Sequence, residues 1–240
     1  MIDERLNDDL VSLEWPTVRD YVRYVESYPE LLGPHGDVKD VQRPWALEQI
    51  RRLVPVGAKV IDMGGASCEL ASQLMDDYEV TVVDPYDGTG NGPKSFSPYK
   101  ARFPRLSFVA AALDETIELP RVFDAVVSTS VLEHIPSELI GTTLRGIDRV
   151  LKPGGFSIHA IDFTVRGEGG GIKERTDAVL SAVFRYYGLP LSPEGLAEEL
   201  LSEVDTYYLS PQMYLRWKKA RKFEEYPWRQ VSSLNLTLRR

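Results

Sequence analysis

Apolar and polar residues alternate in blocks along this chain, and the blocks predict strands and helices in turn. The short apolar runs are rich in β-branched residues, which is typical of strands buried on both faces of a parallel sheet. These predicted strands span residues 59–63, 79–84, 106–110, 123–128 and 155–161. Helical segments separate some of them, at 68–76 and from Ser137, the expected N-cap, to Val150. The alternation predicts the α/β class.

The N-terminal part of the chain shows a different pattern. Residues 1–16 are expected to be loosely structured. Residues 17–28 predict an amphipathic helix capped by Thr17, with one apolar face. That face carries Val18, Tyr21, Val22 and Val25. A second helix is expected over residues 44–53, with Pro44 in its first turn, where proline is favoured.

The C-terminal part predicts two further helices and two strands. The helices cover residues 172–187 and 193–201, and Ser192 is the expected N-cap of the second. Residues 207–209 predict a short strand. Residues 231–238 alternate polar and apolar side chains, which predicts a final antiparallel strand.

One connection is unusually long. Residues 85–104 include Gly88, Gly90 and Gly92, and only residues 97–103 predict a short helix. Long glycine-rich loops in compact domains are usually functional or mobile. A lid over a ligand and a plain surface insertion are both compatible with this pattern.

Composition narrows the class of protein. The chain has 240 residues, which suits one domain with an appended subdomain, and a formal net charge of −8. This acidic balance argues against nucleic-acid binding, which needs a basic face. The single cysteine, Cys68, suits a reducing compartment. Because no apolar signal core or run of ~20 apolar residues is present, we expect a cytoplasmic protein without a membrane partner.

A glycine turn directly follows the first predicted strand. Asp62 ends that strand, and Gly64 and Gly65 follow, which lets the backbone approach a nucleotide-like ligand closely. A carboxylate there disfavours a pyrophosphate and favours a cationic ligand. Asp84 lies 22 residues further on, at the end of the next predicted strand. An acid at that place can accept hydrogen bonds from both hydroxyls of a ribose.

Together with the Leu132-Glu133-His134 and Lys152-Pro153-Gly154-Gly155 segments, these residues resemble the class I S-adenosylmethionine-dependent methyltransferases, especially the small-molecule branch. The resemblance covers about residues 45–165 and a final strand at 231–239. Ala66 and Cys68 stand where that family usually has glycines, which slightly narrows the room around the methionine part of the cofactor.

The resemblance implies a Rossmann-like, doubly wound sheet of seven mostly parallel strands with an antiparallel last strand. It also implies a division of the chain into four parts. These are a helical N-terminal lid (1–44), a cofactor-binding core (45–163), an acceptor-pocket insertion (164–230) and the final sheet strand (231–240).

The resemblance further implies S-adenosyl-L-methionine as cofactor and assigns residues to it. Asp62 would face its amino group, Asp84 its ribose hydroxyls and Asp114 its adenine amine, unless Asp114 is only a helix N-cap. The expected cofactor-binding residues are Asp62, Gly64, Gly65, Ala66, Asp84, Pro85, Tyr86, Leu113, Asp114 and Ser128.

Three residues are the catalytic candidates. His134 occupies a frequent family position near the methyl centre, where a neutral imidazole acts either as a general base or only as a packing group. Asp162 and His159 lie near the carboxyl end of a strand, where acceptors bind. His159 is alternatively a satisfied core histidine. We expect no metal, because the spacing of the three residues is not a metal signature.

The leading hypothesis is methyl transfer to a hydroxyl of a small molecule such as a sugar or secondary metabolite. N- or C-methylation and a non-catalytic partner protein are the alternatives. A nicotinamide-dependent oxidoreductase is disfavoured, because Ala66 and Glu69 stand where its glycine motif needs glycine.

The basic run from Arg216 to Lys222 fits either an anionic acceptor or a solvated helix face. Two tyrosine pairs, at 186–187 and 207–208, line an acceptor pocket or pack a subdomain. We expect a monomer or a homodimer.

Overall fold

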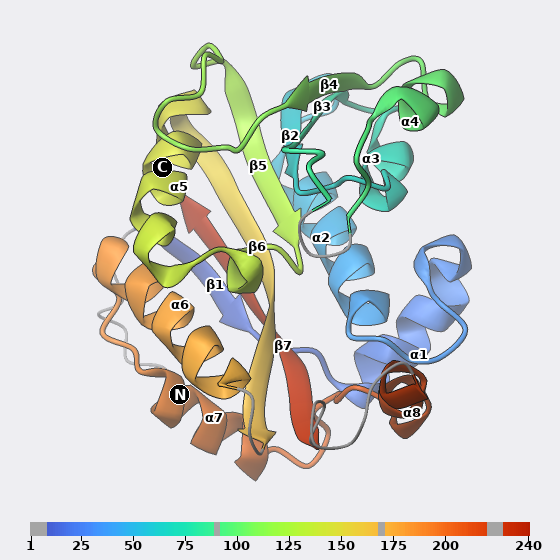
Figure 1. The fold of residues 1–240 in the computed structure, drawn as a ribbon, viewed down its shortest axis with the longest axis vertical. Helices are drawn as coiled ribbons and strands as arrows, with labels where there is room; N and C mark the ends of the chain where they lie inside the picture. Colours follow the sequence, from blue (N-terminus) through green and yellow to red (C-terminus); the bar gives the residue numbers. More distant parts are fainter. Residues whose placement is uncertain (1–8, 89–91, 168–170, 220–227) are drawn as a thin grey trace.

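The computed structural model describes residues 9–88, 92–167, 171–219 and 228–240. A seven-stranded sheet crosses the molecule, with helices packed on both of its faces (Figure 1). The strand order is β1-β7-β6-β5-β2-β3-β4. The strands are β1 (Leu10–Glu14), β2 (Lys59–Met63), β3 (Glu79–Asp84), β4 (Ser107–Ala110), β5 (Phe123–Thr129), β6 (Leu151–Gly167) and β7 (Arg229–Arg239).

The helices cover the sheet in two layers. One apolar core lies between the sheet and α5 to α7, and a second lies between the sheet and α2 with α3. Among the described residues, no helix is long and apolar enough to cross a membrane. The helices are α1 (Val18–Ser27), α2 (Lys39–Leu53), α3 (Glu69–Leu74), α4 (Ser97–Arg102), α5 (Ser137–Val150), α6 (Ile172–Tyr186), α7 (Pro193–Ser202) and α8 (Pro211–Lys219), with the 3-10 segments η1 (Pro29–Leu31) and η3 (Leu132–His134).

The sheet confirms the predicted class and its mostly parallel order. Strands β4, β3, β2, β5 and β6 pair in parallel, and β7 pairs antiparallel with β6. The chain moves along the sheet in opposite directions from β2, toward β4 first and then from β5 toward β6. Strands of this order leave a crevice outside their carboxyl ends, between β2 and β5, where ligands bind.

The seventh strand comes from an unexpected part of the chain. Residues 10–14, expected to be loosely structured, form β1 and pair antiparallel with β7, from Leu10 opposite Leu238 to Glu14 opposite Asn235. The strand predicted at 207–209 is wrong. At that place the structure has only an isolated bridge between Thr17 and Thr206. The Leu209 N–H does donate to Val231 O of β7 at 2.8 Å, but this one backbone hydrogen bond does not make a strand.

Two helix starts also differ from the prediction. Helix α2 begins at Lys39, so Pro44 lies inside it rather than in its first turn. Helix α5 does begin at Ser137, but Pro136 is its N-cap and no side chain caps it. The expected Thr17 cap of α1 is confirmed, and Asp20 completes a capping box with it.

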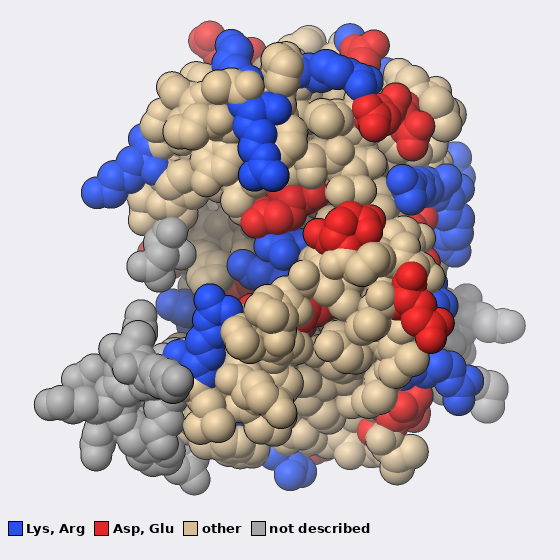
Figure 2. Space-filling view, turned by 90° about the vertical axis from the view of Figure 1, so that its right-hand side faces the viewer, with Lys and Arg blue, Asp and Glu red and all other residues tan. Residues whose placement is uncertain are grey.

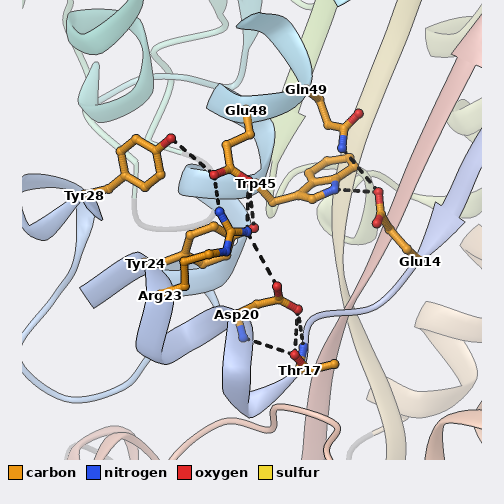
Figure 3. A network of polar contacts seen from close by, with 9 residues as sticks. All are labelled: Glu14, Thr17, Asp20, Arg23, Tyr24, Tyr28, Trp45, Glu48 and Gln49. Atoms are coloured by element: carbon orange, nitrogen blue, oxygen red, sulfur yellow. Dashed lines mark hydrogen bonds and ion pairs between the residues drawn. The ribbon is translucent and has the colours of Figure 1, made fainter. Parts of the chain in front are cut away.

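Helix α1 faces the molecule with a different side than its valines suggested. Tyr24 is its buried residue, whereas Val18, Val22 and Val25 are 46%, 51% and 44% exposed. A polar network explains the orientation (Figure 3). Two hydrogen bonds join Arg23 to Glu48 on α2, and the Tyr28 hydroxyl donates to Glu48 Oε1 at 3.2 Å.

The same network fastens β1 to α2. Trp45 Nε1 donates to Glu14 Oε1 at 2.8 Å, and Gln49 Nε2 donates to the same oxygen at 3.3 Å (Figure 3). Both donors come from buried side chains of α2. The N-terminal segment is therefore attached to the core helix that borders the crevice.

Removal of the Glu14 carboxylate tests this attachment. Glu14→Ala is expected to lower the free energy of unfolding by about 1–3 kcal/mol, because it leaves two buried N–H donors without an acceptor. Urea denaturation measures the change. Glu26→Ala, on the exposed side of α1, is the matched control and should stay within about 0.5 kcal/mol of the parent. Equal midpoints for both variants would contradict the proposed attachment.

Residues 205–210 cross from the C-terminal part of the chain to the N-terminal segment. The Tyr207 N–H donates to Pro16 O at 2.8 Å, and the Ser210 N–H donates to Gly36 O at 3.1 Å. The Tyr207 ring stacks on Tyr21, with centroids 4.8 Å apart. These contacts hold the loop before α2 in place, and α2 begins at the crevice.

Candidate active site

A cavity of about 240 Å3 lies at the carboxyl ends of the central parallel strands. On the side of the molecule that Figure 2 shows, the surface is hollowed, and acidic and basic side chains surround the opening. The turns after β2, β3, β4 and β5 all contribute to the cavity, as does the first residue of α2. Its lining residues are Lys39, Met63, Gly64, Val83, Asp84, Pro85, Asp87, Gly92, Ala112, Leu113, Ser130, Val131, His134, Ile135 and Thr143.

The turn after β2 holds a buried acid against a glycine. Gly64 has φ +69°, which favours glycine, and its N–H donates to Val83 O at 2.8 Å. A Cβ on Gly65 would lie 2.1 Å from Asp62 Oδ2. Asp62 is 1% exposed, and this Oδ2 has no hydrogen-bond partner. Burial, with a smaller contribution from Glu69, raises the pKa of Asp62 to about 7.

The residues after β3 form the next wall. Asp84 Oδ1 accepts from the Tyr86 N–H at 2.7 Å, which holds the carboxylate at the strand end. Asp84 and Pro85 line the cavity. Tyr86, at φ +52°, turns its ring into the protein, where it lies edge-on to Phe96 at 5.6 Å. Burial raises the pKa of Asp84, which is half-buried.

The loop after β4 presents Leu113 and Ala112 to the cavity rather than Asp114. Asp114 Oδ1 instead accepts from the N–H and hydroxyl of Thr116, at 2.8 and 2.6 Å. These bonds lower the pKa of Asp114. A Cβ on Gly146 of α5 would lie 2.4 Å from the Asp114 backbone, so close packing fixes this loop. The side chain of Asp114 therefore stabilises a turn, and no helix of the described residues begins at the place where the N-cap alternative put one.

A sequence match covers most of the segments that line this cavity. A family model described as a methyltransferase domain matches residues 61–159, which include the Asp62 turn, Asp84, Leu113 and His134. This part of the chain is a methyltransferase domain, of the S-adenosylmethionine-dependent kind that the sequence resembles. No curated protein matches its sequence.

Solved structures resemble this methyltransferase in fold. The 1,6-didemethyltoxoflavin-N1-methyltransferase of Burkholderia thailandensis, solved with S-adenosylhomocysteine, has a TM-score of 0.53 and 19% identity, covering 100% of this chain and 97% of that chain. The YcgJ protein of Bacillus subtilis has a TM-score of 0.51 and 13% identity, with 82% and 98% covered. The [4+2]-cyclase SpnF has a TM-score of 0.50 and 16% identity, with 92% and 93% covered. At these identities the likeness supports the fold alone.

The cofactor of the methyltransferase is S-adenosyl-L-methionine, and the Asp62 turn fits it. A buried carboxylate with an unpartnered oxygen suits an ammonium group, because that group would supply both the missing hydrogen bond and an opposite charge. The Gly65 backbone leaves no room for a side chain between the turn and this carboxylate.

Enlarging the turn is expected to close this subsite. Gly65→Ala should weaken the affinity for S-adenosylhomocysteine at least tenfold, because the new Cβ would push the Asp62 carboxylate away. Calorimetric titration measures the affinity. Gly57→Ala is the control: a Cβ on Gly57 would meet open space, so the affinity should be unchanged. Parental affinity in Gly65→Ala would contradict the role of the turn.

His134 is the last residue of η3, which follows β5. It lines the cavity, and its side chain is 51% exposed. Burial lowers the pKa of His134, so the imidazole is neutral at pH 7 and offers a lone pair. Its Nε2 lies 3.8 Å from Oε1 of the buried Glu133, whose pKa burial raises well above the usual range. The position is compatible with the predicted base role.

Asp162 belongs to a polar cluster that the sequence did not reveal. Gln42 Nε2 donates to Asp162 Oδ1 at 2.9 Å, and the Ser130 hydroxyl lies 2.7 Å from the same oxygen. Ser130 lines the cavity, whereas Asp162 lies behind it. Gln42 comes from α2, far away in the sequence, and nothing in the helical pattern distinguished it. Ser130 directly follows β5, so its place after a strand end was the available signal.

Two predicted site residues lie in the core instead. His159 is fully buried, and its Nδ1 and Nε2 lie 2.8 and 2.6 Å from the hydroxyls of Ser128 and Ser157. Burial lowers the pKa of His159 to about 3. The predicted acceptor contact of His159 and the cofactor contact of Ser128 are not supported, because both side chains are satisfied by each other, away from the cavity.

The remaining candidates from the sequence are the tyrosine pairs, the basic run and the glycine-rich loops. Tyr186 donates to Asp148 Oδ2 at 2.7 Å and packs edge-on against Tyr187, so this pair packs the subdomain. Of the predicted basic run, Arg216 lies on α8, whereas Arg221 and Lys222 lie outside the described residues. Residues 89–91 and 168–170 of the glycine-rich loops also lie outside the described residues. Asp87 and Gly92 show that the long connection after β3 borders the cavity.

Proposed function

We propose that the methyltransferase methylates a hydroxyl group of a small molecule, such as a sugar or secondary metabolite. The supporting observation is that His134 and Ser130 line the same cavity as Gly64 and Asp84. A neutral imidazole and a hydroxyl in the wall of this cavity suit an acceptor that must lose a proton. S-adenosyl-L-methionine supplies an activated methyl group when bound, so proximity and orientation account for much of the acceleration.

We assign the cofactor contacts as follows. Asp62, beside Gly64, Gly65 and Ala66, holds the amino group, and Asp84 holds the ribose hydroxyls. Leu113 contacts the adenine, with Pro85 beside it and Tyr86 supporting the loop from behind. Lys39 is a further proposed cofactor contact, which the sequence analysis did not include. It lines the cavity at the first turn of α2, where its ammonium group suits the methionine carboxylate.

The walls of the acceptor side come from both ends of the chain. The loop before α2 belongs to the proposed lid (1–44), and residues 205–210 of the proposed insertion (164–230) hold it by backbone hydrogen bonds. We propose that the two segments together bound the acceptor pocket. Such a wall suits a small acceptor.

The test has two steps. Calorimetric titration with S-adenosyl-L-methionine and separately with NADH should show micromolar binding of the first and none of the second. Formation of S-adenosylhomocysteine is then measured with a panel of sugars, phenols, alcohols and primary amines. Turnover with hydroxyl compounds is the expected result. Turnover with amines alone would replace O-methylation by N-methylation.

Cofactor binding without turnover on any acceptor would favour a non-catalytic partner or another reaction. The possibility of another reaction is considered because SpnF, a structural neighbour with this fold, is a [4+2]-cyclase.

A further inference from the structure

We propose that Ser130 is a catalytic residue that contacts the acceptor and passes its proton to Asp162, and that Gln42 is the positioning residue that aligns the two. This inference rests on the proposed function. It assigns the proton-accepting role to a cluster separate from His134, which faces the same cavity. The three side chains come from α2, from the residue after β5 and from β6.

Ser130 is held in an unfavourable backbone conformation at the cavity wall. Its φ of +52° lies in the left-handed region, which is uncommon for residues other than glycine. The Ser130 N–H donates to Ala160 O at 2.9 Å, which ties the residue to β6. Strain of this kind costs stability and persists where the surrounding structure enforces it, often at active sites.

Gln42 determines how the hydroxyl is oriented. The side chain is fully buried, and its Nε2 faces two acceptors, Asp162 Oδ1 and Ser233 Oγ, at 2.9 and 3.1 Å. Its Oε1 therefore faces Ser130 Oγ, at 2.6 Å. With two acceptors on the inner side, the Ser130 proton points inward and an oxygen lone pair is left for the cavity.

The proton path is balanced in atoms and charge. The acceptor hydroxyl donates to the outward lone pair of Ser130 and transfers its proton there, while the Ser130 proton moves to Asp162 Oδ1. The acceptor oxygen forms a bond to the methyl carbon. The electron pair of the carbon–sulfur bond that breaks remains on sulfur.

The charges around Asp162 narrow the class of acceptor. Asp37 and Glu133 lie near this carboxylate, and each has a pKa raised by burial and then by the charge of Asp162. An anionic acceptor would add a like charge beside Asp162, which is unfavourable. The group that reaches Ser130 is therefore uncharged or cationic, which favours an alcohol or phenol over an acidic acceptor.

The test distinguishes a loss of turnover caused by the missing Ser130 hydroxyl from a loss caused by unfolding. Ser130→Gly removes the hydroxyl and also relieves the positive φ, which offsets the cost of leaving Gln42 Oε1 without its donor, so its Tm should stay near that of the parent. Its kcat with the hydroxyl acceptor found above should fall at least tenfold, with KM and the Kd of S-adenosylhomocysteine changed less than about threefold. Asp162→Asn and Gln42→Met should show the same split. The double variant Ser130→Gly with Asp162→Asn should be no slower than the worse single variant, since the two act in sequence.

Ser157→Ala is the matched control. It removes another buried serine hydroxyl, on β6, that lies against His159 in the core and away from the cavity, so kcat should stay near the parental value. A parental kcat in Ser130→Gly, or multiplying losses in the double variant, would overturn the relay alone. Cofactor binding without any turnover of the parent would instead overturn the proposed function, and the relay with it.

Discussion

Asp84→Ala is expected to weaken the binding of S-adenosyl-L-methionine by about 1–3 kcal/mol, which corresponds to about 5- to 150-fold in Kd. The carboxylate lies at the end of β3, lines the cavity and is oriented by the Tyr86 N–H. Two hydroxyls on one carboxylate form charge-assisted hydrogen bonds, which are stronger than neutral ones. Calorimetric titration of the parent and the variant measures the difference.

Asp114→Asn is the informative control for this experiment. Asp114 was assigned to the adenine by resemblance, but its Oδ1 is occupied by Thr116 and its side chain does not line the cavity. Asparagine can accept the same bonds, so both the affinity and the stability should be retained. A large loss of affinity in Asp114→Asn would restore the adenine contact, and parental affinity in Asp84→Ala would remove the ribose contact.

The sequence predicted the parallel core of the fold well because its strands are buried on both faces. Burial on both faces leaves an unbroken apolar run, and the runs of β2 and β3 match the strands to the residue. Strand β1 shows no such run, because only part of each side chain is covered there. Its place in the sheet depends on the free edge of β7 and on Glu14 meeting Trp45, which are contacts between distant segments.

The candidate site shows the same contrast between residues that a local pattern places and residues that distant contacts place. Asp62, Gly64 and Asp84 follow strand ends, and their roles depend on the local backbone, so a short motif carries the information. The acceptor side depends on which way a side chain points. His159 and Asp162 are three residues apart on one strand and therefore face opposite sides of the sheet: one enters the core and the other approaches α2. Gln42 reaches Asp162 across 120 positions of sequence, which no local pattern reports.

The affinity for S-adenosyl-L-methionine is expected to rise steeply with pH between 5 and 7.5. In the free protein, burial raises the pKa of Asp62 to about 7, above its usual value, so this carboxyl is protonated in acid. The ammonium group of the cofactor binds the ionised carboxylate better, so binding below pH 7 must first release the proton. Each pH unit below 7 then costs up to tenfold, and the affinity at pH 5 should be about 50- to 100-fold weaker than at pH 7.5.

Two comparisons assign this dependence to Asp62. The compound 5′-methylthioadenosine lacks the amino acid part, so its affinity should change little over the same pH range. Asp62→Asn should bind S-adenosyl-L-methionine weakly and without the pH slope, because asparagine does not titrate. Calorimetric titrations at four pH values measure all three cases. A slope that persists in Asp62→Asn would assign the titration to another group, and a flat parental profile would mean that the carboxylate is ionised before the cofactor arrives.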